Sequence, residues 1–162
     1  MRTLYFAALI SLLADQLSKY IVIFAMDLRR LGEIDVFPPL LRYRYGENRG
    51  INFGLFADGS EASRWILIAI AAVICIGVWR WMRRPEMGVL AHLSAGLLIG
   101  GAVANVVDRL LYGYVLDFLN TSCCGFDNPF VFNVADIFIF AGAVGLVFFA
   151  ADNNSAPTEK GK

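Results

Sequence analysis

The sequence predicts an all-α membrane protein with four transmembrane helices and a small β-sheet in the first connecting loop. Of its 162 residues, 58% are hydrophobic and only 17% are charged, which is more apolar than a typical soluble domain. Four segments are apolar over roughly 20 residues, the length that crosses a bilayer. A more polar stretch between the first two segments alternates apolar and polar residues, as β-strands do.

Each predicted span has its own support. The spans are residues 4–26, 65–82, 88–107 and 131–151. Asp15 and Lys19 interrupt the middle of the first span and no small-residue cleavage site follows, so we expect a retained helix and not a cleaved signal peptide. In the second span, Trp65 stands near one end and Trp79 near the other, as residues of two interfacial aromatic belts do.

Residues 1–151 are therefore expected to form one four-span membrane domain, with residues 27–64 as its β-rich loop. The polar segment 152–162 lacks the apolar residues needed to order itself and is predicted to be a disordered tail. The chain has 14 Lys and Arg against 14 Asp and Glu, so its net charge of zero provides no field that would attract nucleic acid. No nucleic-acid partner is expected.

The three cysteines cannot form a closed disulfide framework, because their number is odd. Cys75 lies in an apolar run, where a cysteine behaves as a small hydrophobic residue. Cys123 and Cys124 are adjacent in a loop and have no zinc-like spacing to other ligands. We expect none of the three to have an essential role.

Polar residues collect on one side of the membrane. Because successive spans cross in opposite directions, the ends of spans one and three and the starts of spans two and four share a side. That side carries the segment 48–54, Asn105, Asp108, Arg109, Asp117, Asn133 and Asp136. Ionisable groups within a membrane are costly and usually line a bundle interior or a wet cavity. The sequence therefore predicts one polar pocket at one membrane interface.

The orientation follows less directly from charge. Arg80, Arg83 and Arg84 lie in the short connection between spans two and three, whereas six arginines of the first loop region lie on the opposite side. The same region contains six acidic residues that match those arginines. We therefore favour the short connection as the cytoplasmic one.

The first loop is predicted to contain two antiparallel strands, at residues 41–45 and 51–55, joined by a turn at 48–50. Period-two alternation places tyrosine and phenylalanine on one face and arginine on the other. An ordinary surface hairpin would show the same pattern. Because this hairpin stands beside the polar pocket, we expect it to cover a substrate there, with Phe53 as an apolar clamp.

Helical spacing separates the acidic residues into classes. Asp15 and Lys19 are four residues apart, which predicts an intramembrane ion pair with a structural role. Asn105, Asp108 and Arg109 share one helix face and are interpreted as scaffold around a site. Adjacency in sequence does not imply a contact between Asp108 and Arg109, so each is expected to have a partner on another span.

Asp117 and Asp136 have no basic residue at helical spacing, and each lies where the chain meets the membrane. Two aspartates held close together share a proton, so that one acts as a general base on water while the other donates to a carbonyl. This chemistry suits peptide hydrolysis. The alternative is two solvated interfacial residues, with Asp136 capping the fourth helix.

Five motifs, in chain order, resemble those of lipoprotein signal peptidase, also called signal peptidase II. They are Asp15-Gln16-x-x-Lys19, Asn48-x-Gly50-x-x-Phe53, Gly101-Ala102-x-x-Asn105-x-x-Asp108-Arg109, Val115-x-Asp117-Phe118 and Phe132-Asn133-x-Ala135-Asp136. The resemblance covers nearly the whole chain, from the first span to the fourth. Two positions depart from the family pattern: Asn52 stands where alanine is usual, and Ile137 where serine is common.

The resemblance implies that Asp117 and Asp136 are a catalytic dyad. The dyad would activate water against the bond before the lipid-modified cysteine of a bacterial prolipoprotein, with no metal or other cofactor. The pocket positions that hold substrate would be Asn48, Asn105, Arg109 and Asn133, with Phe53 from the hairpin, whereas Asp15, Lys19, Gly50, Asp108 and Ala135 would give structural support.

The resemblance also implies a location. Signal peptidases of this type lie in the bacterial cytoplasmic (inner) membrane with both termini in the cytoplasm. Their sheet, the cradle, is extracytoplasmic, and their dyad lies near the outer membrane surface. The partners implied are the lipid-modified prolipoprotein and membrane lipids, and a monomer is expected.

Two other classes of function fit part of the sequence. A small proton-coupled transporter would use Asp15, Lys19 and His92, but His92 lies away from the polar side and the folded loop would have no purpose. Proton-driven flux in vesicles would support it. A metal-dependent lipid-headgroup transferase would place several aspartates on Mg²⁺, yet no close carboxylate cluster is evident in the spacing. Loss of activity in chelator would support that class.

Overall fold

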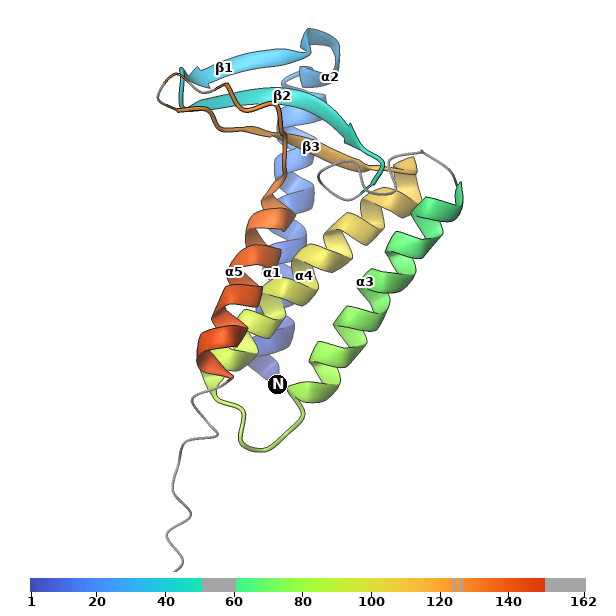
Figure 1. Ribbon diagram of the computed structural model, residues 1–162, viewed down its shortest axis with the longest axis vertical. Helices are drawn as coiled ribbons and strands as arrows, with labels where there is room; N and C mark the ends of the chain where they lie inside the picture. The colour runs from blue at the N-terminus through green and yellow to red at the C-terminus, as the bar shows by residue number, and fades with distance from the viewer. Residues whose placement is uncertain (51–60, 124, 126, 151–162) are drawn as a thin grey trace, which may run out of the picture.

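The computed structural model describes residues 1–50, 61–123, 125 and 127–150. The helices are α1 (Arg2–Lys19), its π-helical continuation η1 (Tyr20–Ala25), the short α2 (Leu28–Leu31), α3 (Glu61–Trp81), α4 (Val89–Tyr112) and α5 (Val134–Phe149). The strands are β1 (Glu33–Phe37), β2 (Leu41–Asn48) and β3 (Val115–Asn120). Four long helices stand side by side, and the strands form a sheet across one end of the bundle (Figure 1). The predicted tail at 152–162 lies outside the described residues.

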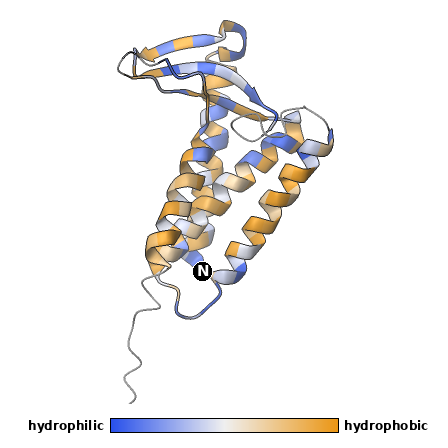
Figure 2. Cartoon of the chain, in the orientation of Figure 1, coloured by the Kyte–Doolittle hydropathy of each residue, from blue (hydrophilic) through white to orange (hydrophobic). Residues whose placement is uncertain are grey.

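The helices have the length and composition of membrane spans. Arg2–Ala25, Glu61–Trp81 and Val89–Tyr112 are long and apolar enough to cross a bilayer. The fourth helix, α5, is apolar but has 16 residues, which corresponds to about 24 Å of helical rise. Apolar colouring runs along all four helices, and polar residues gather at the sheet end (Figure 2). The predicted class, four membrane helices with a small sheet, is confirmed.

The predicted span boundaries need correction at the sheet end. The second and third helices extend beyond the predicted ranges, to Glu61 and Tyr112. The fourth begins at Val134 and not at residue 131, because Phe132 bridges to Leu119 of β3 and Asn133 is the N-cap of α5. Hydropathy includes these residues in the span, since it does not distinguish a buried strand from a helix.

Helix α4 is central, and glycines allow its neighbours to approach closely. A Cβ atom at Gly96 would lie 2.5 Å from the carbonyl oxygen of Leu4 on α1. A Cβ atom at Gly101 would lie 2.5 Å from the carbonyl oxygen of Ala135 on α5. These glycines therefore permit close helix packing, and the contact at Gly101 fixes the start of α5 against α4.

The sheet has the order β1-β2-β3 with antiparallel pairing throughout. The predicted first strand, 41–45, is confirmed as part of β2. Its described partners are β1, from the same loop, and β3, from the chain between α4 and α5, neither of which was predicted. The predicted second strand, 51–55, and with it Phe53, lies outside the described residues.

The sheet is anchored to the end of the first span. Phe118 of β3 is buried and packs edge-on against Tyr43 of β2, with ring centroids 5.8 Å apart. Phe118 and Leu116 also belong to a hydrophobic cluster with Val22 and Ile23 of η1. Because side chains alternate across a strand, burying Leu116 and Phe118 places Asp117, between them, on the opposite face.

Candidate active site

The two carboxylates predicted to form a dyad come from β3 and α5. Asp117 is opposite Gly46 of β2 in the strand register and is 2% exposed. Asp136 is the third residue of α5. Asn133 caps the helix: its side-chain oxygen accepts a hydrogen bond from Asp136 N at 2.9 Å, and its own N–H donates to Asp136 Oδ2 at 3.3 Å. This is a capping box, so the capping interpretation of Asp136 is correct and is compatible with a place in the site.

Two asparagines connect the carboxylates. Asn133 Nδ2 donates to Asp117 Oδ1 at 2.6 Å and to Asn105 Oδ1 at 3.2 Å. Asn105 Nδ2 in turn donates to Asp136 Oδ1 at 3.0 Å. A chain of amide hydrogen bonds therefore runs from one carboxylate to the other, through side chains on α4 and at the start of α5.

A third asparagine completes the set. Asn48, at the end of β2, donates from Nδ2 to Asp117 Oδ2 at 3.1 Å. Every oxygen of the two carboxylates thus accepts a hydrogen bond from an amide group. Such bonds orient a carboxylate while leaving it able to hold or release a proton, because an amide neither gains nor loses one near neutral pH.

The environment of Asp117 favours its protonated form. Burial, with the negative charge of Asp136 as the next largest cause, raises the pKa of Asp117 to about 7. The hydrogen bonds from Asn133 and Asn48 lower this pKa and offset part of the effect. A pKa raised toward neutrality lets Asp117 hold a proton while its partner is charged, which gives the pair one acid and one base.

Arg109 lies beside the carboxylates but donates its hydrogen bonds to backbone carbonyls. Its Nη2 donates to Gly50 O at 3.2 Å and its Nη1 to Asn105 O at 3.4 Å. Gly50 is buried at this contact. Arg109 therefore connects the chain after β2 to α4. The expectation of a partner on another span is wrong for Arg109, because its two described acceptors lie in the loop after β2 and on its own helix.

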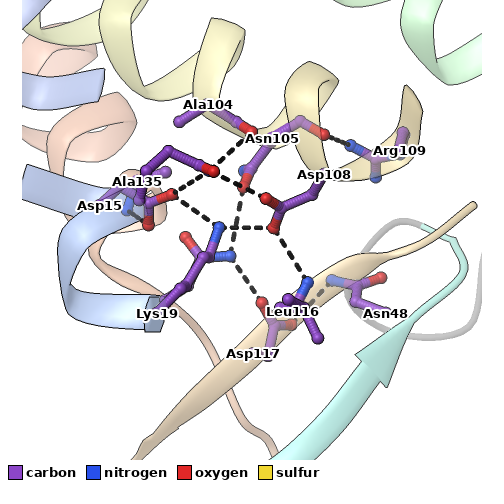
Figure 3. Close-up of polar contacts among 12 residues, drawn as sticks. Asp15, Lys19, Asn48, Ala104, Asn105, Asp108, Arg109, Leu116, Asp117 and Ala135 are labelled. Atoms are coloured by element: carbon purple, nitrogen blue, oxygen red, sulfur yellow. Dashed lines mark hydrogen bonds and ion pairs between the residues drawn. The ribbon is translucent and has the colours of Figure 1, made fainter. Parts of the chain in front are cut away.

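The residues predicted to give structural support form a second cluster. Lys19 Nζ lies 2.7 Å from Asp15 Oδ2, which confirms the predicted ion pair, and 2.6 Å from Asp108 Oδ2 (Figure 3). Asp108 thus has its partner on another span, as expected. Gln16, for which no separate role was predicted, donates to Asp108 Oδ1 at 2.9 Å. The signal that could have indicated this role is the position of Gln16 in the first motif, one residue after Asp15.

The structure brings together most of the residues singled out from the sequence. The carboxylate pair is surrounded by Asn48, Asn105 and Asn133, with Gly50 and Arg109 at the edge, and Ala135 lies buried next to Asp136. In the described part of the chain, no group of three or more His, Cys, Asp or Glu is arranged to hold a metal ion.

The structure describes four other residues singled out from the sequence: Ile137, His92, Cys75 and Cys123. Ile137 is 47% exposed. His92 makes its hydrogen bond to Gly88 O at 2.8 Å, at the start of α4 and at the opposite end from Asp108. Cys75 is a free thiol and Cys123 is disulfide-bonded, whereas Cys124 and Asn52 lie outside the described residues.

Comparison with known proteins identifies the family of this chain. The family model described as signal peptidase (SPase) II matches residues 7–151. A lipoprotein signal peptidase of Methylorubrum extorquens (strain PA1) is 39% identical over 149 residues, covering 90% of this chain and 85% of that protein. One of Alteromonas mediterranea is 34% identical over 161 residues, covering 99% of this chain and 86% of that protein.

Solved structures show the same fold. A bacterial membrane enzyme determined by the in meso method superposes with a TM-score of 0.80 at 26% identity, covering 100% of this chain and 95% of its own. A second such structure gives a TM-score of 0.77 at 25% identity and covers 96% of each chain. With the family model spanning all four helices and the sheet, this chain belongs to the signal peptidase II family of aspartic peptidases.

Proposed function

We propose that Asp117 and Asp136 are the catalytic dyad with which this signal peptidase II cleaves signal peptides from prolipoproteins. The bond cleaved is the one on the N-terminal side of the lipid-modified cysteine. The observation that carries the proposal is the amide chain between the two carboxylates, Asp117 to Asn133 to Asn105 to Asp136. It holds two acids together without supplying a cation to either.

The chemistry follows from a singly protonated pair. The charged carboxylate takes a proton from water, whose oxygen attacks the scissile carbonyl carbon, while the protonated carboxyl group donates its proton to the carbonyl oxygen. The tetrahedral intermediate collapses when its hydroxyl returns a proton to the dyad. The carboxyl group that took the proton from water then donates it to the departing amide nitrogen. Both carboxyl groups return to their starting states.

The asparagines orient the dyad in this mechanism. Both hydrogen bonds recorded for Asn133 Nδ2 go to site residues, and Asn105 Nδ2 donates to Asp136. Holding the reacting groups in place contributes to rate by removing the entropy cost of aligning them. We further propose that Asn48 and Arg109 hold the substrate backbone at the edge of the site, beside Gly50, to which Arg109 is bonded.

We also propose an orientation, on the basis of the charges at the two ends of the bundle. The connection that contains Arg83 and Arg84 would be cytoplasmic, together with the N-terminus, and the sheet and dyad would lie near the outer surface of the bacterial cytoplasmic membrane. Arg83 lies over the Trp79 ring, 5.0 Å from its centroid, which is a suitable arrangement for a headgroup interface. On this proposal the protein works as a monomer.

The test is cleavage of a purified diacylglyceryl prolipoprotein by the purified protein, with release of the signal peptide as the readout. Asp117→Asn and Asp136→Asn should each fold and insert normally yet lose activity by at least about 10³-fold, because an amide cannot share the proton of the dyad. Metal chelators should leave activity intact. Substantial turnover by either variant would show that the dyad is assigned wrongly, and loss of activity in chelator would favour the metal-dependent alternative.

A further inference from the structure

We propose that Lys19 is a positioning residue that sets the relative placement of the two catalytic aspartates. It acts through Asp15 and Asp108, each of which holds the backbone directly before one member of the dyad. This inference rests on the proposed function, because it explains how the dyad is held. It assigns to the support cluster a role in the catalytic rate as well as in stability.

Two hydrogen bonds connect the support cluster to the backbone beside the dyad, and we call each of them an arm. Asp15 Oδ1 accepts a hydrogen bond from the N–H of Ala135 at 2.9 Å, and Ala135 immediately precedes Asp136. Asp108 Oδ2 accepts a hydrogen bond from the N–H of Leu116 at 3.1 Å, and Leu116 immediately precedes Asp117. Figure 3 shows both arms meeting at the lysine. The two carboxylates of the support cluster thus hold equivalent points on two different elements.

Lys19 joins the arms at one point. Its Nζ is within 2.7 Å of Asp15 Oδ2 and 2.6 Å of Asp108 Oδ2. Its side chain is 3% exposed and those of both aspartates are 0% exposed. Because charges interact strongly where water is excluded, moving the ammonium group displaces both carboxylates. The backbone at Ala135 and Leu116 would follow.

The arm at Ala135 has a further physical reason. Asn133 is the N-cap of α5, so Ala135 lies in its first turn, where N–H groups have no acceptor within the helix. Asp15 supplies that acceptor from α1, and a carboxylate is favoured there by the helix dipole. The start of α5, which carries Asp136, is therefore placed by a charge on another span.

A purely structural role makes a different prediction. If the support cluster only stabilised the bundle, removing it would lower the amount of folded enzyme, and each folded molecule would keep its catalytic rate. If it positions the dyad, folded molecules should lose kcat while KM stays the same, since the substrate contacts are elsewhere.

The experiment compares two neutral double variants, D15N/K19M and D15L/K19M. Both remove the ion pair, but only asparagine keeps an oxygen that can accept from Ala135 N–H. We expect kcat per folded molecule to be about 10-fold higher in D15N/K19M, at equal KM with the diacylglyceryl prolipoprotein, as the loss of one hydrogen bond implies. Equal kcat in the two variants would overturn the proposal.

Gly96→Ala is the matched structural control. The added Cβ would lie 2.5 Å from Leu4 O at the far end of the α1–α4 interface, away from the dyad. It should lower stability and leave kcat per folded molecule unchanged. If D15L/K19M behaves in the same way, with activity lost only in proportion to the folded fraction, the positioning role is wrong.

Hydrogen exchange keeps the proposal testable if D15L/K19M does not fold. In folded D15N/K19M, which lacks the lysine but keeps an acceptor for Ala135 N–H, amide exchange at Leu116 and Ala135 should be about 10-fold faster than in the unaltered protein, while amides of α3 keep their rates. Unchanged exchange at both amides would overturn the proposal. Failure of the dyad itself is seen separately, because turnover by Asp117→Asn would remove the proposed function and leave these exchange rates as they are.

Discussion

Two polar clusters are connected through the backbone at Leu116 and Ala135, and each contains two aspartates. In the support cluster, Lys19 lies between Asp15 and Asp108 and forms an ion pair with both. In the dyad, Asp117 and Asp136 are joined by asparagine amides, and among the described residues no lysine or arginine forms an ion pair with either. The difference between a structural and a reactive pair is therefore the group that connects the carboxylates.

The two kinds of connecting group differ in their effect on the protonation of the carboxylates. A cation between two carboxylates offsets their mutual repulsion and favours their charged forms. Amides orient carboxylates but neutralise no charge, so a carboxylate pair joined by amides favours holding one proton between its members. The pKa of Asp117, raised to about 7 by burial and by Asp136, is the result of that arrangement.

Removing the lysine tests this contrast with the largest expected effect on stability. Lys19→Met should lower the free energy of unfolding by about 3–5 kcal/mol, because it leaves buried carboxylates without their cation. The double variant K19M/D15L should recover part of this loss but not all of it, since Asp108 also loses its partner. Chemical denaturation in detergent micelles measures both. A double variant no more stable than Lys19→Met would contradict the pairing.

The variant Phe53→Ala tests whether substrate binding is separate from both clusters. If the ring is buried against lipid-modified substrate, as the sequence predicts, Phe53→Ala should raise KM with a smaller fall in kcat, because that contact would be worth about 2–3 kcal/mol and would be made equally in the ground and transition states. Steady-state cleavage of the prolipoprotein separates the two constants. A fall in kcat at constant KM would instead make the segment part of the catalytic scaffold.

Adding a methyl group at Gly101 tests how closely α5 must approach α4. In Gly101→Ala the Cβ would lie 2.5 Å from Ala135 O, which forces the start of α5 to move and should cost about 1–3 kcal/mol of stability. Gly77→Ala on α3 is the matched control, because nothing lies within 4 Å of its Cβ. The control should gain about 0.5–1 kcal/mol from helix propensity. Equal changes in the thermal midpoint would contradict the close contact.

Removing one of the asparagine amides that donate to the dyad should have the smallest effect on the rate. Its readout is the pH dependence of cleavage. Asn48→Ala removes a hydrogen bond that lowers the pKa of Asp117, so this pKa should rise above its present value of about 7. If Asp117 carries the shared proton, cleavage falls as pH rises through its pKa, and the alkaline limb of kcat/KM should move to higher pH in the variant. The rate should fall only a few-fold. An alkaline limb that moves to lower pH would contradict this reading of the amides.

The raised pKa of Asp117 also makes the stability of the protein depend on pH. This dependence has the opposite sign to that of a salt-bridged aspartate, whose pKa is lowered. The pKa of Asp117 is higher in the folded state than the ordinary value of 3.8, so folding favours its protonated form. Its contribution to stability is present below the unfolded pKa and is lost as pH rises toward about 7. Asp117→Asn should remove this part of the pH dependence, which denaturation at pH 4 and pH 7 can measure.

Much of this protein follows from its sequence because the signals are local. Apolar runs of bilayer length predicted the four helices, since hydrocarbon permits few other structures. The spacing of four between Asp15 and Lys19 predicted their ion pair, because such residues share a helix face. The order of the motifs identified the family, and the absence of a nearby basic residue singled out Asp117 and Asp136.

The tertiary structure decided which distant residues meet. Nothing near Lys19 in the sequence indicates that Asp108 is its second partner, or that β2 pairs with β1 and β3. The residues 131–133 were assigned to a span because hydropathy does not reveal a bridge to Leu119. Only folding shows that Asp15 and Asp108 hold the N–H groups preceding Asp136 and Asp117. Local patterns report burial and periodicity, whereas hydrogen bonds between spans depend on how the helices pack, which no single segment encodes.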